Sequence, residues 1–223
     1  MKDDRDWVPD ATDLDYIEAT ARPIHPVLAE IETAAKPGHI PILSRDAGRV
    51  LSILAGGRRR MLEVGTAYGY STLWLALGQP DDGTIATIDP DVARTTIARG
   101  FWRSAGIRDG RIAVVNRPAL EAFAAGGTEP ALAGPFDLAF IDALKPEYAA
   151  YFEAIVPRLA ADALVLADNV LWSGRASGTR PSRGDDASTE ALRGFNAAVL
   201  SDRRFRSTIL PVGDGLLLAL FTG

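Results

Sequence analysis

The chain contains no cysteine, and this excludes disulfides, thiolate nucleophiles and zinc or iron–sulfur centres held by cysteine. It has only two histidines, His25 and His39, so a metal site built from several histidines is excluded as well. Long apolar runs are also missing: Leu216 to Phe221 is among the longest, and a membrane span needs about 20 apolar residues. Because no apolar segment follows the charged N-terminus, we expect no signal peptide.

An excess of positive charge is missing too. Lysine and arginine number 24 against 29 acidic residues, which gives a net charge of −5. A broad nucleic-acid-binding surface needs the opposite balance, although a local basic patch stays open. The remaining composition, 47% hydrophobic and 24% charged over 223 residues, is typical of a globular protein. We therefore expect a small acidic cytoplasmic enzyme that does not enter a membrane.

The N-terminal part of the chain, up to about Leu54, has a helical pattern. Pro23 and Pro26 interrupt this pattern, Pro37-Gly38 ends its first stretch, and Ser44 is typical of the N-cap of a following helix. The side chains that recur there at three- and four-residue spacing predict helices with one apolar face. They are Tyr16, Ile17, Thr20, Ile24, Leu28, Ile31 and Ala35.

From residue 60 onward, short apolar runs alternate with amphipathic stretches, which predicts parallel strands separated by helices. The runs are Met61–Val64, Thr84–Ile88, Ile112–Val115, Leu138–Ile141 and Leu164–Ala167. The expected helices lie near 71–78, 91–105, 119–125 and 147–160. At the end of the chain, 207–212 and 216–221 flank Gly213-Asp214-Gly215, which indicates an antiparallel hairpin.

The predicted fold is therefore α/β: a doubly wound, Rossmann-like sheet with helices on both faces. Its seven strands would be five parallel strands plus the C-terminal antiparallel hairpin. We expect a single domain, in which residues 1–45 form a helical segment that contributes to the substrate site and to a dimer. Residues 46–223 would form the cofactor-binding core.

A glycine-rich turn follows the first predicted strand, at the edge where a doubly wound sheet binds its ligand. Its spacing, Glu63-x-Gly65-x-x-x-Gly69, differs from the dinucleotide fingerprint, and the Gly-Lys-Ser/Thr ending of a P-loop is missing. A carboxylate at Glu63 would repel a pyrophosphate but attract an ammonium or sulfonium cation. Asp89 ends the second strand, where an acid commonly binds both ribose hydroxyls of an adenosine. Together these residues favour an adenosine-bearing cationic cofactor over NAD, while a tight turn without ligand and a helix cap at Asp89 stay open.

Oxygen ligands gather at the ends of the fourth and fifth predicted strands. Asp142 closes one strand, Asp168 and Asn169 close the other, and both ends face the same crevice as Gly65. Two carboxylates and one amide suit Mg²⁺, Ca²⁺ or Mn²⁺ rather than zinc. Lys145, three residues after Asp142, would lie close to a substrate there. The alternative interpretation makes both aspartates helix caps and Lys145 a solvated charge.

Three motifs in this order resemble the cation-dependent class I O-methyltransferases, which include catechol and caffeoyl-coenzyme A O-methyltransferases. They are Glu63-Val-Gly-Thr-x-x-Gly-Tyr-Ser-Thr, Phe140-Ile-Asp-Ala-x-Lys and Asp168-Asn-Val-Leu-Trp-Ser-Gly. The resemblance covers about residues 38 to 223 and implies S-adenosylmethionine and Mg²⁺, or else Mn²⁺ or Ca²⁺, as cofactors. It also implies methyl transfer to a hydroxyl of a catechol-type or other vicinal-diol aromatic small molecule, by a protein that is commonly a homodimer.

The resemblance also assigns roles to residues of this chain. It places Glu63, Gly65, Thr66 and Ser71 at the methionine part of the cofactor, Asp89 at the ribose and Ala119 at the adenine. The metal ligands would be Asp142, Asp168 and Asn169. Asp142 would also lie near the cofactor, and it would take part in catalysis together with Lys145. The cation would stabilise a phenolate, and Lys145 would accept its proton or hold the phenolate electrostatically. For the homodimer we expect exposed apolar side chains in the N-terminal segment, such as Ile17 and Leu28.

The chain departs from the family pattern at three places. Leu144 stands where many relatives carry aspartate. Residues 40–43 stand in place of a Met/Thr-rich segment that, in many relatives, touches cofactor and substrate. Residues 1–37 match the family poorly. The acceptor therefore stays open. The candidate walls of its pocket are Trp7, Tyr148, Tyr151 and Trp172, which also fit a core or an interface.

Three other functions compete with this one. Methylation of a hydroxylated tRNA base would need a basic patch, for which 58–60 and the run Arg175, Arg180 and Arg183 are candidates. A non-catalytic module that binds S-adenosylmethionine would need neither the metal ligands nor Lys145. A nicotinamide-dependent oxidoreductase is disfavoured by Glu63 and by the glycine spacing.

Overall fold

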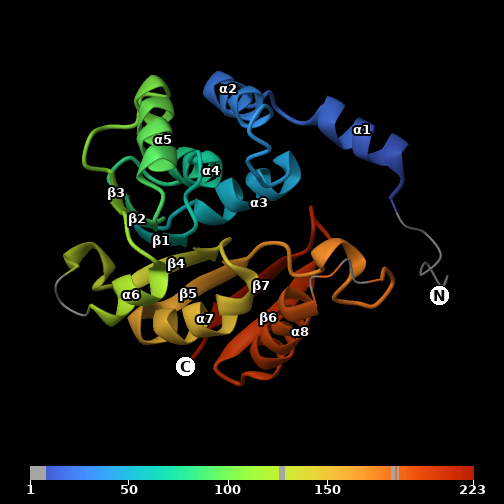
Figure 1. Ribbon diagram of the computed structural model, residues 1–223. Helices are drawn as coiled ribbons and strands as arrows, with labels where there is room; N and C mark the ends of the chain where they lie inside the picture. Colours follow the sequence, from blue (N-terminus) through green and yellow to red (C-terminus); the bar gives the residue numbers. More distant parts are fainter. Residues whose placement is uncertain (1–8, 126–128, 182–183, 185) are drawn as a thin grey trace.

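The structure is a computed structural model that describes residues 9–125, 129–181, 184 and 186–223. Its centre is a sheet of seven strands in the order β3-β2-β1-β4-β5-β7-β6 (Figure 1). The strands are β1 (Arg60–Val64), β2 (Thr84–Ile88), β3 (Ile112–Val115), β4 (Phe136–Ile141), β5 (Leu159–Ala167), β6 (Phe205–Leu210) and β7 (Leu216–Phe221). The first five pair in parallel and β7 is antiparallel to both β5 and β6, so the predicted α/β fold with a closing hairpin is confirmed.

Helices cover both faces of the sheet, and each face has its own apolar core. On one face lie α2 (Pro26–Ala35), α3 (Arg45–Ala55), α4 (Tyr70–Gly78) and α5 (Val92–Ser104). On the other lie α6 (Ala119–Ala124), α7 (Tyr148–Ile155) and α8 (Asp186–Ser201). In the part of the chain that the structure describes, no helix has the length and apolarity to span a membrane.

The parallel register aligns the strand ends that were predicted to form the site. Val64 pairs with both Ile88 and Ile141, and Ile141 pairs with Ala167. The residues that follow these positions therefore leave the sheet at one edge, and they are Gly65, Asp89, Asp142 and Asp168.

Three element boundaries and one helix differ from the sequence analysis. The helix expected over 147–160 ends at Ile155, a 3₁₀ turn follows over Val156–Arg158, and β5 begins at Leu159 rather than at 164. Pro157 in that turn has no N–H to continue a helical ladder, which accounts for the early end. The closing hairpin begins at Phe205 rather than at 207. Helix α8 was not predicted, although its buried residues recur at helical spacing: Thr189, Leu192, Phe195 and Val199.

The N-terminal helices divide into a covered one and an uncovered one. α1 (Ala11–Thr20) buries no side chain, and Ile17 is 43% exposed, as expected. The expectation that Leu28 is also exposed is wrong: it is 0% exposed, because α2 packs against α4 and α5. Ser44 caps α3 as predicted, and its hydroxyl accepts the N–H of Ala47.

Candidate active site

A cavity of about 720 Å³ opens at the edge where β1, β2, β4 and β5 end. Ligand pockets for small molecules are typically about 300–1,000 Å³, so the cavity has room for a cofactor and a small acceptor. One wall comes from 41–43, between α2 and α3, and another from 142–147. The predicted site residues that line it are Gly65, Thr66, Ser71, Asp89, Ala119, Asp142, Lys145, Asp168 and Asn169.

Glu63 is the predicted residue that does not line this cavity. Its carboxylate is completely buried beneath the glycine turn and accepts three hydroxyl hydrogens, from Ser71 (2.6 Å), Thr72 (2.5 Å) and Thr87 (2.6 Å). Burial raises the pKa of Glu63 to about 7 against the effect of these hydroxyls, and the charge of Asp142 adds to the increase. A ligand in the cavity would meet Ser71, which Glu63 orients, and not the Glu63 carboxylate itself.

The hydroxyl of Thr66 belongs to the same buried network. Thr87 gives its hydrogen to Glu63, so in the 2.6 Å contact between the two threonine hydroxyls Thr66 is the donor. Glu63 therefore fixes the orientation of two cavity-lining hydroxyls: that of Ser71 directly, and that of Thr66, inside the glycine turn, through Thr87.

Both glycines of the turn are required by the packing of the protein. Gly65 has φ +101° and Gly69 has φ +74°, conformations that L side chains rarely adopt. A Cβ at Gly65 would overlap the main-chain oxygen of Asp142, and one at Gly69 would overlap the indole of Trp102. The indole Nε1 of Trp102 donates to the Gly69 carbonyl at 3.0 Å, so Trp102 supports the turn from below.

Asp89 joins the end of β2 to the glycine turn. Its Oδ2 accepts the main-chain N–H groups of Thr66 (3.1 Å) and Ala67 (2.8 Å), and Oδ1 accepts that of Asp91 (2.9 Å). The N-cap of α5 is Asp91, which accepts the N–H of Arg94. The alternative interpretation of Asp89 as that helix cap is therefore wrong.

Asp168 carries a buried polar atom that lacks a partner among the described residues. Its Oδ1 is buried and has no hydrogen-bond partner in the described part of the chain, while Oδ2 accepts from the side-chain amide of Asn169 at 3.2 Å. Burial first, and then the charge of Asp142, raise the pKa of Asp168 to about 7. A buried carboxylate oxygen without a partner is costly, and a cation would remove that cost.

The donor set around Asp168 fits a hard divalent cation. Asp142, Asp168 and Asn169 offer two carboxylates and one amide, which are the oxygen ligands that Mg²⁺, Mn²⁺ and Ca²⁺ take. The described residues contain no group of three or more histidine, aspartate or glutamate side chains placed to hold a metal. A cation here would therefore depend on the amide of Asn169 and on oxygens of a bound substrate or water.

Lys145 is a buried, fully oriented group and not a solvated charge. It is 9% exposed, and its Nζ donates to Asp142 Oδ1 (2.8 Å) and to the hydroxyl of Tyr148 (2.7 Å). The Tyr148 hydroxyl in turn donates to the main-chain oxygen of Asp168 at 3.1 Å. The helical turns that follow Asp142 and Asp168 have no side-chain cap, so the alternative of two helix-capping aspartates is wrong.

The aromatic wall candidates separate into three groups. Tyr151 and Trp172 line the cavity, and Lys145 lies 5.8 Å from the Trp172 ring centre. Tyr148 is completely buried behind Lys145 and is not part of the wall. Trp7 lies outside the described residues. The sequence analysis missed Tyr70, which also lines the cavity although it belongs to the glycine-turn motif.

Four of the arginines that were considered for a nucleic-acid surface, Arg58, Arg59, Arg60 and Arg175, have other side-chain contacts, whereas Arg180 is exposed. Arg58 donates to the main-chain oxygens of Asp137 and Asp162, Arg59 pairs with Asp82, and Arg60 lies over the ring of Phe136. Arg60 is the first residue of β1, Arg58 and Arg59 precede it, and the cavity is at the other end of that strand. The guanidinium of Arg175 lies 4.7 Å over the Trp172 ring, and Arg183 lies outside the described residues.

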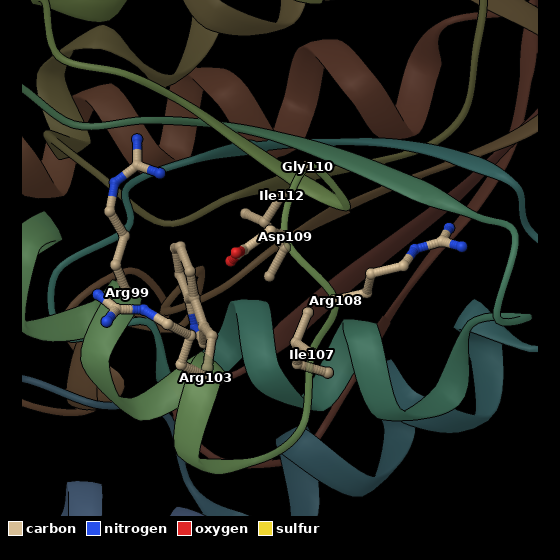
Figure 2. A pocket seen from close by; sticks show the side chains of 8 residues that line it. Arg99, Arg103, Ile107, Arg108, Asp109, Gly110 and Ile112 are labelled. Atoms are coloured by element: carbon tan, nitrogen blue, oxygen red, sulfur yellow. The ribbon is translucent and has the colours of Figure 1, made fainter.

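A smaller hollow of about 190 Å³ lies between α5 and the start of β3. Arg99 and Arg103 flank it on one side, while Figure 2 shows the Arg108 side chain directed away from both. Asp109 lies between Arg108 and the other two arginines, so the three guanidinium groups do not converge on one point. None of the predicted site residues lines this hollow.

Comparisons with known proteins point to one family. A family model described as O-methyltransferase matches residues 18–221. A catechol O-methyltransferase from Mycobacterium tuberculosis is 35% identical over 194 residues, which cover 84% of this chain and 83% of that protein. A caffeoyl-CoA O-methyltransferase from Populus kitakamiensis is 33% identical and covers 78% of this chain and 75% of its own length. The crystal structure of an O-methyltransferase from Bacillus cereus in complex with SAH matches with a TM-score of 0.80 at 28% identity, over 93% of this chain and 96% of that one.

Proposed function

Since the chain belongs to the O-methyltransferase family, we propose that it transfers a methyl group from S-adenosylmethionine to an aromatic hydroxyl. The acceptor is a catechol-type or other vicinal-diol aromatic small molecule, and a divalent cation such as Mg²⁺ binds beside it. The names of two relatives, a catechol and a caffeoyl-CoA O-methyltransferase, support this class of acceptor. The Bacillus cereus structure in complex with SAH supports the cofactor.

One observation supports the proposal most strongly: Asp168 lines the same cavity as the glycine turn, and its buried Oδ1 has no hydrogen-bond partner among the described residues. Asp142, Asp168 and Asn169 would hold the cation. When bound, the cation supplies Lewis-acid stabilisation of an ionised hydroxyl. Two adjacent hydroxyls on the acceptor suit a site in which the protein provides only three ligands.

The cofactor would lie along the glycine turn, with its adenosine end toward Asp89 and Ala119. Asp89 would bind the ribose hydroxyls, and Thr66 and Ser71, which Glu63 orients, would bind the methionine part. The backbone of Gly65 lines the cavity and would lie against the cofactor. These assignments bring the sulfonium methyl toward Asp142 and Lys145.

The residues of the chain would align the cofactor with the acceptor and would stabilise the ionised acceptor hydroxyl or accept its proton. Methyl transfer is an in-line displacement, in which the bond from carbon to sulfur breaks as the bond to the acceptor oxygen forms. An ammonium group has three N–H donors, and Asp142 and Tyr148 use two of those of Lys145. The third is left for the acceptor oxygen, where Lys145 either holds the ionised hydroxyl or, when neutral, accepts its proton.

The single domain and the dimer are part of the same proposal. Residues 46–223 would form the catalytic core, and 1–45 would cover it and contact a second copy of the chain. Support comes from α1, which buries no side chain and exposes Leu14 (50%), Tyr16 (69%) and Ile17 (43%). Exposed apolar side chains of this size fit a surface that another chain covers.

A substrate screen tests the proposed activity. The purified protein would be incubated with S-adenosylmethionine, Mg²⁺ and separate catechols, flavonoids and hydroxycinnamoyl thioesters, and methylated products would be scored by mass. Matched phenols with a single hydroxyl are the control. We expect products from vicinal diols and much less from single hydroxyls, whereas a lack of product from every diol would contradict the proposal.

A further inference from the structure

Glu32 on α2 connects three helices around the large cavity. Its Oε1 accepts from Arg45 Nε (2.8 Å) and from the Tyr70 hydroxyl (2.7 Å), and its Oε2 accepts from Arg45 NH2 (2.7 Å). Arg45 is the first residue of α3, and Tyr70 is the first residue of α4. One carboxylate therefore links α2, α3 and α4.

The contact between Glu32 and Arg45 closes the base of a loop that lines the cavity. The chain between these two residues leaves α2 and returns into α3, and 41–43 forms a wall of the cavity. A guanidinium–carboxylate pair with two parallel hydrogen bonds fixes distance and orientation together. The pair thus fixes the distance and orientation between the two ends of the loop.

The contact with Tyr70 ties this loop base to the cofactor side of the cavity. Tyr70 is 2% exposed, lines the cavity, precedes Ser71 and packs edge-on against Trp74 with ring centres 6.2 Å apart. Burial first, and then the bond to Glu32, raise the pKa of Tyr70, while Arg45 lowers the pKa of Glu32. A neutral phenol therefore donates to an ionised carboxylate.

We propose that Glu32 is a positioning residue that sets the separation between the wall at 41–43 and the first turn of α4. It acts through Arg45 and Tyr70 and touches neither cofactor nor acceptor. The inference rests on the proposed function in so far as the cavity binds S-adenosylmethionine. Loss of the link would leave the cavity wall and Ser71 free to move relative to each other, which weakens cofactor binding and misaligns the acceptor.

Glu18 provides a matched control in the same network. Its carboxylate accepts from Arg45 (2.5 Å) and Arg49 (2.7 Å) and attaches α1 to α3. Glu18 does not contact Tyr70, and α1 does not contribute to the cavity wall. Glu18→Gln therefore weakens an ion pair to the same arginine without breaking the link to α4.

The test uses Glu32→Gln, Tyr70→Phe, the double variant and Glu18→Gln. Calorimetry would measure SAH affinity without metal or acceptor, and steady-state kinetics would give KM for S-adenosylmethionine and for the best acceptor. We expect Glu32→Gln and Tyr70→Phe each to weaken SAH binding roughly 3- to 10-fold, the effect of one hydrogen bond. The double variant should lose less than the product of the two, because both changes break one link. Glu18→Gln should stay within about 2-fold of wild type.

Other outcomes would overturn the inference. If Glu32→Gln lowers Tm but leaves SAH affinity and both KM values unchanged well below Tm, then Glu32 only stabilises the fold. Independent, multiplicative effects of the two substitutions would show that Glu32 does not act through Tyr70. Wild-type protein that fails to bind SAH would overturn the proposed function itself, whereas normal wild-type binding with unaffected variants would overturn the positioning role alone.

Discussion

The ammonium nitrogen of Lys145 lies 2.7 Å from the hydroxyl oxygen of Tyr148, and the lysine is the donor in this contact. The direction follows because Tyr148 gives its own hydrogen to the main-chain oxygen of Asp168. Tyr148 is completely buried, and burial raises its pKa far above the ordinary value, so it remains a neutral acceptor for the lysine. The strand ends of β4 and β5 thus orient Lys145 before any substrate is present.

Replacement of Lys145 by arginine keeps the charge but removes the ability to give up a proton. For a lysine that accepts the phenol proton, Lys145→Arg should lower kcat roughly 10²–10⁴-fold, with much less change in SAH affinity. The rate of the variant should partly recover at high pH, where the acceptor ionises unaided. Near wild-type kcat in both Lys145→Arg and Lys145→Ala would show that Lys145 is not catalytic.

Replacement of Asp89 should weaken the cofactor site in two ways. Asp89→Ala removes the proposed ribose ligand and also frees the main-chain N–H groups of Thr66 and Ala67. We expect S-adenosylmethionine affinity to fall by about 1–3 kcal/mol, the range for hydrogen bonds to a charged group. Calorimetry would compare S-adenosylmethionine affinity in wild type, Asp89→Ala and Asp91→Ala, where Asp91 is the N-cap of α5 and serves as the control. Equal affinities in the three proteins would refute the assignment of Asp89 to the ribose.

Glu63 should make the fold less stable as the pH rises. The pKa of Glu63 is about 7 in the folded protein and 4.5 in the unfolded chain. Between these two pH values the folded state therefore binds more protons than the unfolded state. The free energy of unfolding should therefore fall between pH 4.5 and 7 by up to about 3 kcal/mol through this group. Denaturation of wild type and Glu63→Gln at pH 5 and pH 8 isolates the effect, since other groups cancel in the comparison. The same pH dependence in both proteins would contradict it.

The apolar surface of α1 predicts a homodimer. Light scattering at micromolar concentration should give twice the mass of the chain, and Ile17→Glu with Leu14→Glu should shift the protein toward monomer. Ile53→Glu on α3 is a matched control, because Ile53 is also exposed but lies on another helix. A wild-type monomer would refute the dimer, and equal dissociation by the control would refute its location.

The sequence predicts the strands well because apolar runs such as Thr84–Ile88 have few alternatives in a parallel sheet. It also places Asp142 and Asp168 correctly, since parallel strands bring their carboxyl ends to one edge. The burial of Glu63 could not be predicted, because its partners Ser71 and Thr87 come from different elements. The burial of Leu28 likewise depends on which helices pack over it, and a helical pattern in the sequence does not predict the packing partner.

The cation dependence of methyl transfer tests the central claim most directly. Turnover of the best vicinal-diol acceptor would be measured for wild type and Asp168→Asn, in EDTA and after addition of Mg²⁺ or Mn²⁺. We predict that EDTA abolishes wild-type turnover and that either cation restores it, while Asp168→Asn stays inactive. That variant should remain folded with an equal or higher Tm in EDTA, because it replaces a buried carboxylate, whose Oδ1 has no partner in the described part of the chain, by a neutral amide. Full wild-type activity in EDTA, or an active Asp168→Asn, would contradict the proposed site.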